Sequence, residues 1–295
     1  MAVPDVRRAD DAGALRGVVA VWNAITPREP VSVELLEGRL ARQPERLYLV
    51  AVEDGHAVGG ALAAPSDSPG RVSLDVRVLP EARRQGVGST LYEQVEAHAL
   101  ALAPNALSTS VSEASPEGRR FAEQRGYREV DRQVELVRAL RGGERPPRRL
   151  RGIEIVELTE AMRPAAYVVT RQAWADFPLA YAVPAPGWDE WVRDEFDGPI
   201  AFAALEKEEV VGFAALLSPP VDGLLEHGLT ACLRTHRGRG IGTALKQTQI
   251  AWAAAHGYRE LVTFTQRGNE AMRRVNTKLG YVEQPAWLTM RRDVS

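Results

Sequence analysis

Cysteine is nearly absent from this 295-residue chain, in which Cys232 is the only one. A lone cysteine excludes a disulfide framework within the chain and a zinc site built from thiolates. An excess of one charge is also lacking, since 37 Lys and Arg residues face 39 Asp and Glu residues, for a net charge of −2 at pH 7. A chain so balanced is not typical of a protein that binds nucleic acid mainly through charge.

Long hydrophobic runs are missing too. No apolar stretch reaches the ~18 residues that a membrane-spanning helix needs, and the N-terminal residues lack the basic-then-apolar pattern of a secretion signal. Apolar residues make up 45% of the chain and charged residues 26%, which are ordinary globular values. We therefore expect a cytoplasmic protein that has no metal and no nucleic-acid or membrane partner.

The chain contains an internal repeat. Residues 83–91, Arg-Arg-Gln-Gly-Val-Gly-Ser-Thr-Leu, recur 154 residues later as 237–245, Arg-Gly-Arg-Gly-Ile-Gly-Thr-Ala-Leu. The pair Gly-Tyr at 126–127 recurs at the same offset as 280–281. Separate matches at one long offset indicate a duplicated domain and not a solenoid of short repeats.

The offset is one residue smaller upstream, where residues 58–61 match 211–214 after 153 residues. Paired glycines and prolines in an Arg-rich stretch between the copies break regular structure and predict a linker. The predicted domains are residues 1–140 and 153–295, and the predicted linker is residues 141–152.

Hydrophobic periodicity predicts the same order of elements in both copies, β-α-α-β-β-β-α-β-α-β. This order gives an α/β class with a mixed sheet flanked by helices, of the α+β kind. In the second copy a strand at 224–233 leads through a glycine loop into a helix at 240–256. The closing strands are expected at 127–140 and 281–290.

The glycine loop, Arg-x-x-Gly-x-Gly, carries the strongest chemical signal. Glycines let backbone N–H groups approach a phosphate, and the N-terminus of the following helix adds unpaired donors and partial positive charge. The arginine adds a charge-assisted contact. No Gly-Lys-Ser/Thr follows, which excludes a Walker loop, and Leu91 and Leu245 stand where the dinucleotide fingerprint needs a third glycine. We predict a pyrophosphate cradle in each copy, formed by Arg83, Arg84, Gln85, Gly86, Val87, Gly88 and Ser89, and by Arg237, Gly238, Arg239, Gly240, Ile241, Gly242 and Thr243.

These motifs resemble the GNAT N-acetyltransferase superfamily, and their duplication is similar to its tandem members, such as the mycothiol synthases. Residues 78–83, Val-Leu-Pro-Glu-Ala-Arg, match the family's lead-in, and 269–281 resembles a subgroup motif that begins with Asn and ends in Gly-Tyr. The resemblance covers nearly the whole chain and implies two tandem GNAT-type domains that bind acetyl-CoA as co-substrate. It also implies that pantetheine pairs like a strand along 76–78 or 230–233. This adds to the cofactor-binding residues Val78, Cys232, Leu233 and Asn269.

Transfer of an acetyl group to an amine requires a base for the ammonium, a donor for the oxyanion and a proton for the leaving thiolate. The resemblance points to Glu226 as the base and to a backbone N–H near Leu233 as the oxyanion donor. Strand alternation places Glu226 on one face with Thr230 and Cys232, and the first copy has Val72 at the equivalent position. A surface carboxylate is the simpler interpretation of the same residue.

His227 is a second candidate, as base or proton relay, although a lone histidine at a strand edge is more often structural. Asn276 stands where the family often has a tyrosine acid, and it could bond the CoA sulfur or a water but is a poor acid. Cys232 has no readable base partner, which favours a packed residue over a covalent acetyl-enzyme.

Aromatic residues are unequally divided, and six crowd the two helices that follow the first strand of the second copy. These are Trp174, Phe177, Tyr181, Trp188, Trp191 and Phe196, with acidic residues Asp189, Glu190, Asp194, Glu195 and Asp197 among them. They could wall and attract a cationic acceptor, or they could pack as core and solvated helix face.

The first hypothesis is a monomeric or homodimeric acetyl-CoA-dependent N-acetyltransferase, acting on a primary amine of a small molecule by direct attack, chiefly in the second copy. The alternatives are a non-catalytic acyl-CoA-binding or sensing module, and a protein acetyltransferase.

Overall fold

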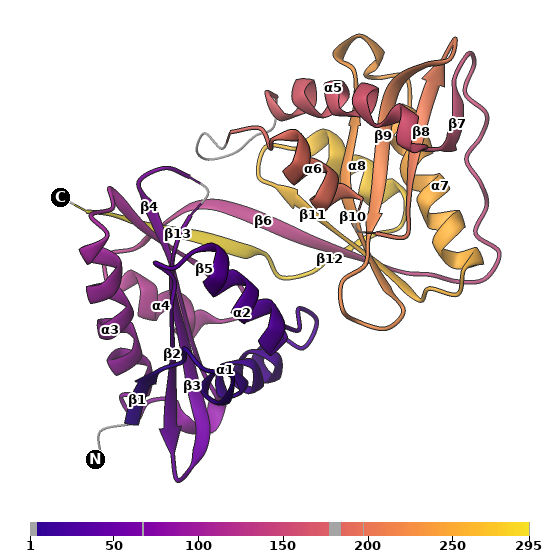
Figure 1. Cartoon of the computed structure of the whole chain (residues 1–295). Coiled ribbons are helices and arrows are strands. Elements are labelled where there is room, and N and C mark those ends of the chain that lie inside the picture. Colours follow the sequence, from indigo (N-terminus) through magenta and orange to yellow (C-terminus); the bar gives the residue numbers. More distant parts are fainter. Residues whose placement is uncertain (1–4, 67, 177–183, 197, 295) are drawn as a thin grey trace. The chain divides into compact units, whose positions relative to one another are not determined.

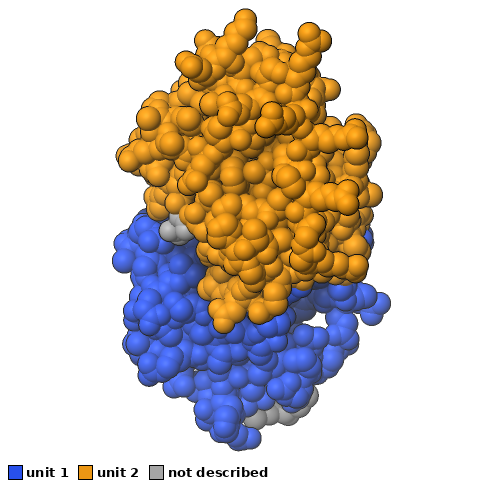
Figure 2. Space-filling view, turned by 90° about the vertical axis from the view of Figure 1, so that its right-hand side faces the viewer, with its two compact units in different colours: residues 1–130, 288–295 blue, residues 131–287 orange. Residues whose placement is uncertain are grey.

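Both copies of the repeat fold into the predicted order of elements in the computed structural model, which describes residues 5–66, 68–176, 184–196 and 198–294 (Figure 1). Packing divides the chain into unit 1, residues 1–130 with 288–295, and unit 2, residues 131–287, coloured separately in Figure 2. Each unit contains a sheet with helices on both faces, so the predicted α/β class with a mixed sheet is confirmed. No described helix has both the length and the apolar character needed to span a bilayer.

Unit 1 has the sheet order β1-β2-β3-β4-β5-β13. Its elements are β1 (Asp5–Arg8), α1 (Ala12–Ile25), α2 (Val33–Arg42), β2 (Leu47–Glu53), β3 (His56–Pro65), β4 (Arg71–Val78), α3 (Val87–Ala101), β5 (Ala106–Ser112), α4 (Pro116–Glu123) and β13 (Trp287–Asp293). Asp11 and Ser32 cap α1 and α2 by accepting backbone N–H bonds from Ala14 and Leu35. The α1 core residues Leu15 and Val18 pack with Trp22 against β2.

Unit 2 has the sheet order β6-β11-β10-β9-β8-β7, with the short β12 paired to β6. Its elements are β6 (Arg128–Ala139), β7 (Glu154–Glu157), α5 (Arg163–Trp174), α6 (Trp188–Glu195), β8 (Ile200–Glu206), β9 (Glu209–Leu217), β10 (Leu224–Cys232), α7 (Ile241–Ala255), β11 (Glu260–Gln266), α8 (Glu270–Lys278) and β12 (Val282–Glu283). The α7 stripe of Ile241 and Leu245 packs on one sheet face with Ala214. Val169 of α5 and Trp191 of α6 pack on the other face with Phe213.

The closing strands of the two copies are exchanged. β6 belongs to the first copy in sequence but pairs over residues 133–139 with β11 of unit 2, where Leu136 is buried in the core. β13 closes the second copy in sequence but lies beside β5 in unit 1. The repeat therefore divides the chain at 140 and 153, whereas packing divides it at 130 and 288.

The predicted closing strand at 281–290 is interrupted. It forms β12 and then β13, with Gln284, Pro285 and Ala286 between them. Pro285 has no N–H to donate to a ladder, so it ends β12 and allows the chain to leave unit 2 for the unit 1 sheet.

The two parallel strand pairs separate soon after they begin. β10 pairs with β11 only at its first three residues, up to Glu226, and β4 pairs with β5 only up to Ser73. Beyond these residues, β10 and β4 continue without a parallel neighbour toward the glycine loops. Each unit therefore has a wedge between its parallel strands, with the loop and helix N-terminus at its open end.

β10 contains a β-bulge that β4 lacks. Its register against β9 shifts between His227 and Thr230, whereas β4 pairs with β3 without interruption. The extra residue is Gly228 or Leu229, and the equivalent position in β4 is occupied by Asp75 alone. This bulge accounts for the change of the repeat offset from 153 to 154 residues.

The bulge also corrects the predicted faces of β10. Glu226 pairs with Leu217 and therefore shares the α5–α6 face with Ala231, not with Thr230 and Cys232 as simple alternation predicted. His227 takes the face of Thr230 and Cys232, toward α7. Counted through the strand pairing, the first-copy equivalent of Glu226 is Ser73 and not Val72.

Candidate active site

The glycine loop of unit 2 presents an open helix N-terminus. Gly238 and Gly240 have φ of +76° and +83°, which side chains rarely adopt, and Gly240 is the N-cap of α7. A Cβ added to Gly238 or Gly242 would have no described atom within 4 Å. The start of α7 is therefore bordered by small residues that leave room beside its first turn, which fits the predicted pyrophosphate cradle.

The basic side chains of this loop are already paired with carboxylates. Arg237 binds Asp176 at 2.8 Å and Arg239 binds Glu206 at 2.6 Å, while Arg234 also bonds Asp176. The bonds from Arg234 and then Arg237 lower the pKa of Asp176 to about 2. These pairs orient the predicted contacts Arg237 and Arg239 at the edge of the cradle, where they remain partly exposed.

The wedge beside β10 offers unpaired polar groups. Leu233 donates its N–H to Val211 on β9, so the alternating N–H groups of Thr230 and Cys232 point to the wedge. The N–H of Leu233 is thus occupied, and the oxyanion donor expected near it is better sought at these neighbours. Two buried side-chain oxygens, Thr230 Oγ1 and Asn276 Oδ1, have no hydrogen-bond partner in the described part of the chain. An extended chain carrying amides, such as pantetheine, matches these groups.

Asn269 and Asn276 both belong to the α8 segment, in different settings. Asn269 is the N-cap, and its side chain accepts the N–H of Met272. Asn276 is fully buried, and its Nδ2 donates to Thr265 on β11 at 3.2 Å. Asn276 thus lies beside the part of β11 that has separated from β10, and its contact with the CoA sulfur or a water stays a prediction.

His227 is held inside the core. Gln249 donates to the carbonyl of Ala215, so its oxygen faces His227 Nδ1 at 2.8 Å, and that nitrogen carries the hydrogen. His227 Nε2 therefore accepts the hydroxyl of Tyr281. Burial holds the pKa of His227 well below its usual value. Both ring nitrogens are engaged, so the buried site gives His227 no route to a substrate proton.

The opposite face of the bulge carries carboxylates. Glu195, at the end of α6, accepts the N–H of Leu229 with its Oε2 at 3.0 Å. A Cβ added to Gly228 would lie 2.5 Å from the same oxygen, so only glycine leaves room for it. Glu226 precedes the bulge on this face. From the sequence alone, Glu195 is only one of several acidic residues of a helix, because no local pattern reveals the bulge beneath it.

Cys232 is packed and not activated. It contacts the cluster of Ile241 and Leu245, and burial raises the pKa of its thiol. A thiol of raised pKa is a poor nucleophile near neutral pH, which supports its interpretation as a packed residue.

The glycine loop of unit 1 has the same backbone but a filled surrounding. Gly86 caps α3 with φ +93°, and Arg84 takes the left-handed φ of +63° that corresponds to Gly238 in unit 2. A Cβ on Gly88 would meet Val78 at 3.5 Å and the Phe121 ring at 3.7 Å. Side chains from the α4 segment thus cover the first turn of α3.

Arg125 completes this cover in unit 1. Its guanidinium lies 3.5 Å from the centre of the Phe121 ring and donates to Ser89 Oγ at 3.0 Å. Arg83 donates to the carbonyl of Val78, at 3.0 Å. That residues 78 and 83–89 hold acetyl-CoA stays a prediction, and the filled gap weighs against it.

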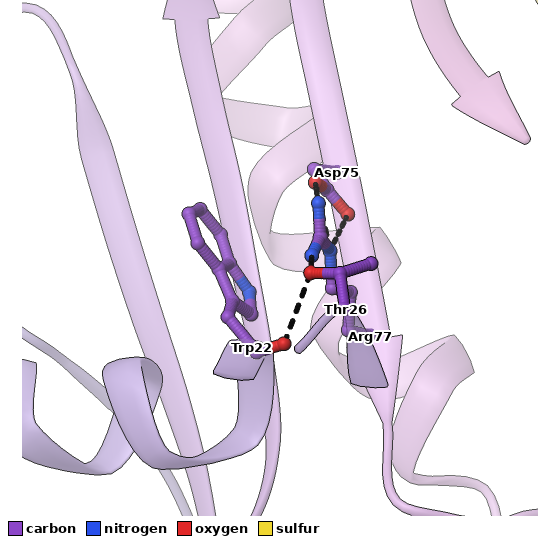
Figure 3. A network of polar contacts seen from close by, with 4 residues as sticks. All are labelled: Trp22, Thr26, Asp75 and Arg77. Carbon is purple, nitrogen blue, oxygen red and sulfur yellow. Dashed lines mark hydrogen bonds and ion pairs between the residues drawn. The ribbon is translucent and has the colours of Figure 1, made fainter. Parts of the chain in front are cut away.

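A polar network covers the face of β4 that points toward α1 (Figure 3). Arg77 forms a fork on Asp75, with its NH2 2.8 Å from Oδ2, and donates to Thr26 Oγ1 at 2.5 Å. The guanidinium also lies 4.9 Å from the centre of the Trp22 ring. The counterparts in β10 are the bulge and Ala231, so unit 1 has an ion pair where unit 2 has the bulge and Glu195.

The aromatic residues of α5 and α6 pack mainly with one another. Trp191 is buried, and its ring lies 5.0–5.8 Å from those of Tyr167, Trp188, Phe196 and Phe213. Trp188 is 40% exposed. Phe177, Tyr181 and Asp197 lie outside the described residues. The described rings therefore act chiefly as the core that fixes α6 over the bulge.

In the described part of the chain, no three His, Cys, Asp or Glu side chains are grouped so that they could hold a metal ion. The profile of a family described as "Acetyltransferase (GNAT) family" matches residues 18–127 and 159–281, which is one match in each copy. A search of curated proteins finds no match.

Two solved structures are similar to nearly the whole of this chain. A GCN5-related N-acetyltransferase from Sphaerobacter thermophilus is 19% identical with a TM-score of 0.78, over 98% of this chain and 95% of that one. A tandem GNAT protein from the clavulanic acid biosynthesis pathway is 17% identical with a TM-score of 0.77, over 99% and 98%. At these identities the likeness shows the fold.

Proposed function

Because the chain belongs to the acetyltransferase (GNAT) family and is thereby an acyltransferase, we propose that its second copy moves an acetyl group from acetyl-CoA to a primary amine of a small molecule. The observation that carries this proposal is the wedge of unit 2. β10 leaves β11 after Glu226, its N–H groups at Thr230 and Cys232 face the gap, and the open N-terminus of α7 lies at its end.

The residues of unit 2 divide the work of binding the co-substrate. Backbone N–H groups of the 238–242 loop and the guanidinium groups of Arg237 and Arg239 hold the pyrophosphate. The pantetheine arm runs along β10 from Cys232 toward the bulge, a path of about 10 Å for three strand residues. Asn276 Oδ1 and Thr230 Oγ1 gain partners from its polar atoms. The thioester then lies at the bulge, where β10 and β11 separate.

Direct attack by the amine follows from the lack of an activated nucleophile among the described residues at this place. Cys232 has a raised thiol pKa, and His227 is engaged on both nitrogens. The carboxylates on the α5–α6 face favour a cationic acceptor, which must give up a proton before it attacks. The hydrogen bond of Glu195 to the Leu229 N–H brings the end of α6 against the bulge, and this close approach favours a small amine over a protein side chain.

The test is amine-dependent release of the CoA thiol, measured as initial rates with acetyl-CoA and a panel of primary amines. Gly242 permits a matched pair of variants, because its added Cβ would touch no described atom. Gly242→Ala should keep the wild-type rate within about threefold. Gly242→Glu places a carboxylate in the cradle and should lower kcat/KM for acetyl-CoA about 100-fold. Absence of turnover with every amine, or equal rates in both variants, would overturn the proposal.

The alternative of a non-catalytic acyl-CoA module is favoured by no described feature of unit 2. Unit 1 gives this alternative no support either, because the Asp75–Arg77 pair and the Phe121–Arg125 cover occupy both sides of β4. We therefore propose that unit 1 has a supporting role and that unit 2 performs the reaction as a monomer or within a homodimer.

A further inference from the structure

We propose that Glu195 is the general base of unit 2, taking from the acceptor ammonium the proton that it must lose before its nitrogen attacks the acetyl carbonyl. This inference rests on the proposed function of unit 2. Nothing in the loop motif or in the repeat points to Glu195. The inference follows from the position of the Glu195 carboxylate at the end of α6.

The position of Glu195 is fixed by a hydrogen bond, by its close approach to Gly228 and by the packing of the next residue. Its Oε2 accepts the N–H of Leu229 at 3.0 Å, and it lies directly over Gly228, where a Cβ would be 2.5 Å away. The neighbouring Phe196 anchors the end of α6, with its ring 5.0 Å from that of Trp191. Gly228 and Leu229 are the bulge residues that follow Glu226, the last residue of β10 that pairs with β11. Glu195 is thus placed at the apex of the wedge, where the thioester lies in the proposed reaction.

The surroundings make this carboxylate a base of suitable strength. Burial raises the pKa of Glu195 to about 7, against the opposing effect of the Leu229 N–H, and the charge of Asp194 raises it further. Within the described residues no basic side chain is paired with it. At neutral pH a carboxylate of this pKa is ionised in a fraction of the protein molecules, and it takes a proton more readily than an exposed glutamate does.

The other charged groups near Glu195 leave it this role. On α6, Asp194 pairs with Arg193 at 2.9 Å, and on α5 the guanidinium of Arg163 lies over the Phe196 ring. On β10, Glu226 occupies the same face, just before the bulge, and is the second carboxylate that attracts the ammonium. From β9, Leu217 and Ala215 supply only apolar contacts at Gly228.

The proton balance is complete with these groups. Glu195 takes one proton from the acceptor ammonium, and the free amine forms a C–N bond to the acetyl carbonyl carbon. The C–S bond then breaks, and the leaving thiolate takes the excess proton that remains on the attacking nitrogen. Glu195 returns its proton to solvent, so the products are the amide, the CoA thiol and one proton.

The test compares pH profiles of kcat/KM for Glu195→Gln, Glu226→Gln and wild type, with an amine that the wild type acetylates. The amide introduced by Glu195→Gln can still accept the Leu229 N–H but cannot take a proton. This variant should lower kcat/KM for the amine about 100-fold at pH 7 and remove the acidic limb near pH 7, with KM for acetyl-CoA unchanged. Asp194→Asn should move that limb to lower pH without changing the plateau. Glu208→Gln, at an exposed position between β8 and β9, is the control and should leave profile and rate unchanged.

Each outcome decides between the proposals. Wild-type turnover with an unaltered acidic limb in Glu195→Gln overturns the role of Glu195 and leaves the proposed function intact. Loss of the limb in Glu226→Gln alone assigns the base to Glu226 instead. A wild type that acetylates no amine overturns the proposed function and this inference together. A second readout is independent of turnover: carboxyl ¹³C titration of the protein should show one group near pH 7 that Glu195→Gln removes.

Discussion

The two copies share a backbone plan but differ in what fills it. In both, a parallel strand pair separates after three residues and a loop with a left-handed glycine opens a helix. In unit 1 the Phe121 ring covers the first turn of α3, whereas the equivalent turn of α7 at Gly242 has no described atom near its missing Cβ. The two copies show that the same loop backbone can be covered by side chains in one unit and left uncovered in the other. Side chains from elements far along the sequence decide whether it stays open.

One residue makes the second difference. β4 runs straight, and Asp75 and Arg77 form an ion pair under Trp22. β10 has an extra residue at the same place, and the bulge turns the Leu229 N–H toward Glu195. In unit 1 the charged groups at this place pair with each other. In unit 2, with one extra residue, a carboxylate lies there at the end of an open wedge.

The largest expected effect is on the stoichiometry of acetyl-CoA binding. Calorimetry should find one site per chain, because the cover of Phe121 and Arg125 blocks the unit 1 cradle. Gly242→Glu should abolish the heat of binding, and Gly88→Glu should leave stoichiometry and affinity unchanged.

Two sites in the wild type, or loss of one site in Gly88→Glu, would break this comparison and show that the unit 1 cover opens. Circular dichroism of both variants serves as the control for folding. If the cover is the main obstacle, Phe121→Ala should create a second, weaker site.

The next effect tests the bulge. Gly228→Ala places a methyl group 2.5 Å from the present position of Glu195 Oε2, and so must displace the carboxylate. We expect kcat to fall about 10–100-fold while the Kd for acetyl-CoA stays within about twofold, since misplacement by about an ångström is enough for such a loss. Glycine at 187, whose added Cβ would meet no described atom within 4 Å, provides the matched Gly187→Ala control. Equal activity in the two variants would separate the bulge from catalysis.

The cores behind the wedges differ as well. In unit 2 the fully buried Lys246 donates to Thr263 at 3.3 Å and lies over the Tyr281 ring. Its counterpart in unit 1 is Tyr92, whose hydroxyl donates to Glu96 at 3.0 Å and lies 3.4 Å from that of Tyr127. Unit 2 therefore keeps a titratable amine in its core where unit 1 has a neutral phenol.

Burial lowers the pKa of Lys246 to about 7 from 10.5 in the unfolded chain. Between these values the unfolded state holds more protons than the folded state, so stability rises with pH over that window and is flat below it. Lys246→Met should remove this rise, which has a slope of up to about 1.4 kcal/mol per pH unit. Urea unfolding of wild type and variant from pH 7 to 10, followed by tryptophan fluorescence, measures the difference. Parallel curves would show that Lys246 stays charged when folded.

Much of this architecture could be predicted from the sequence. Periodicity and turn residues predicted the order of helices and strands in both copies, and the repeated glycine loops identified the family that the profile match confirms. These signals are local, because apolar spacing and glycine placement act within one element. The change of offset from 153 to 154 was visible too, although its meaning as a bulge needed the register of β10 against β9.

The rest depends on contacts between distant segments. Alternation put Glu226 on the wrong face, because an unpaired residue inside a strand leaves no mark in a single sequence. His227 could not be recognised as a core residue without Gln249 and Tyr281, which come 22 and 54 residues later. The exchange of β6 and β13 was equally hidden, since each strand follows its own copy and reveals its neighbour only when folded.

The smallest expected effect concerns the exchange of the closing strands β6 and β13. Arg292 belongs to the second copy in sequence, yet it pairs with Glu96 of α3, lies 5.4 Å from the centre of the Tyr127 ring and donates to the Arg125 carbonyl at 3.3 Å. Because this pair is partly buried and stacks on an aromatic ring, Arg292→Ala should destabilise unit 1 by about 1–2 kcal/mol. Hydrogen exchange followed by mass spectrometry should show faster exchange in α3 and β5, with α7 and β10 unchanged. The neighbouring Arg291→Ala, whose partner is Asp293 on its own strand, is the control. Faster exchange in unit 2 instead would mean that β13 stabilises the copy it follows in sequence and not the sheet it joins.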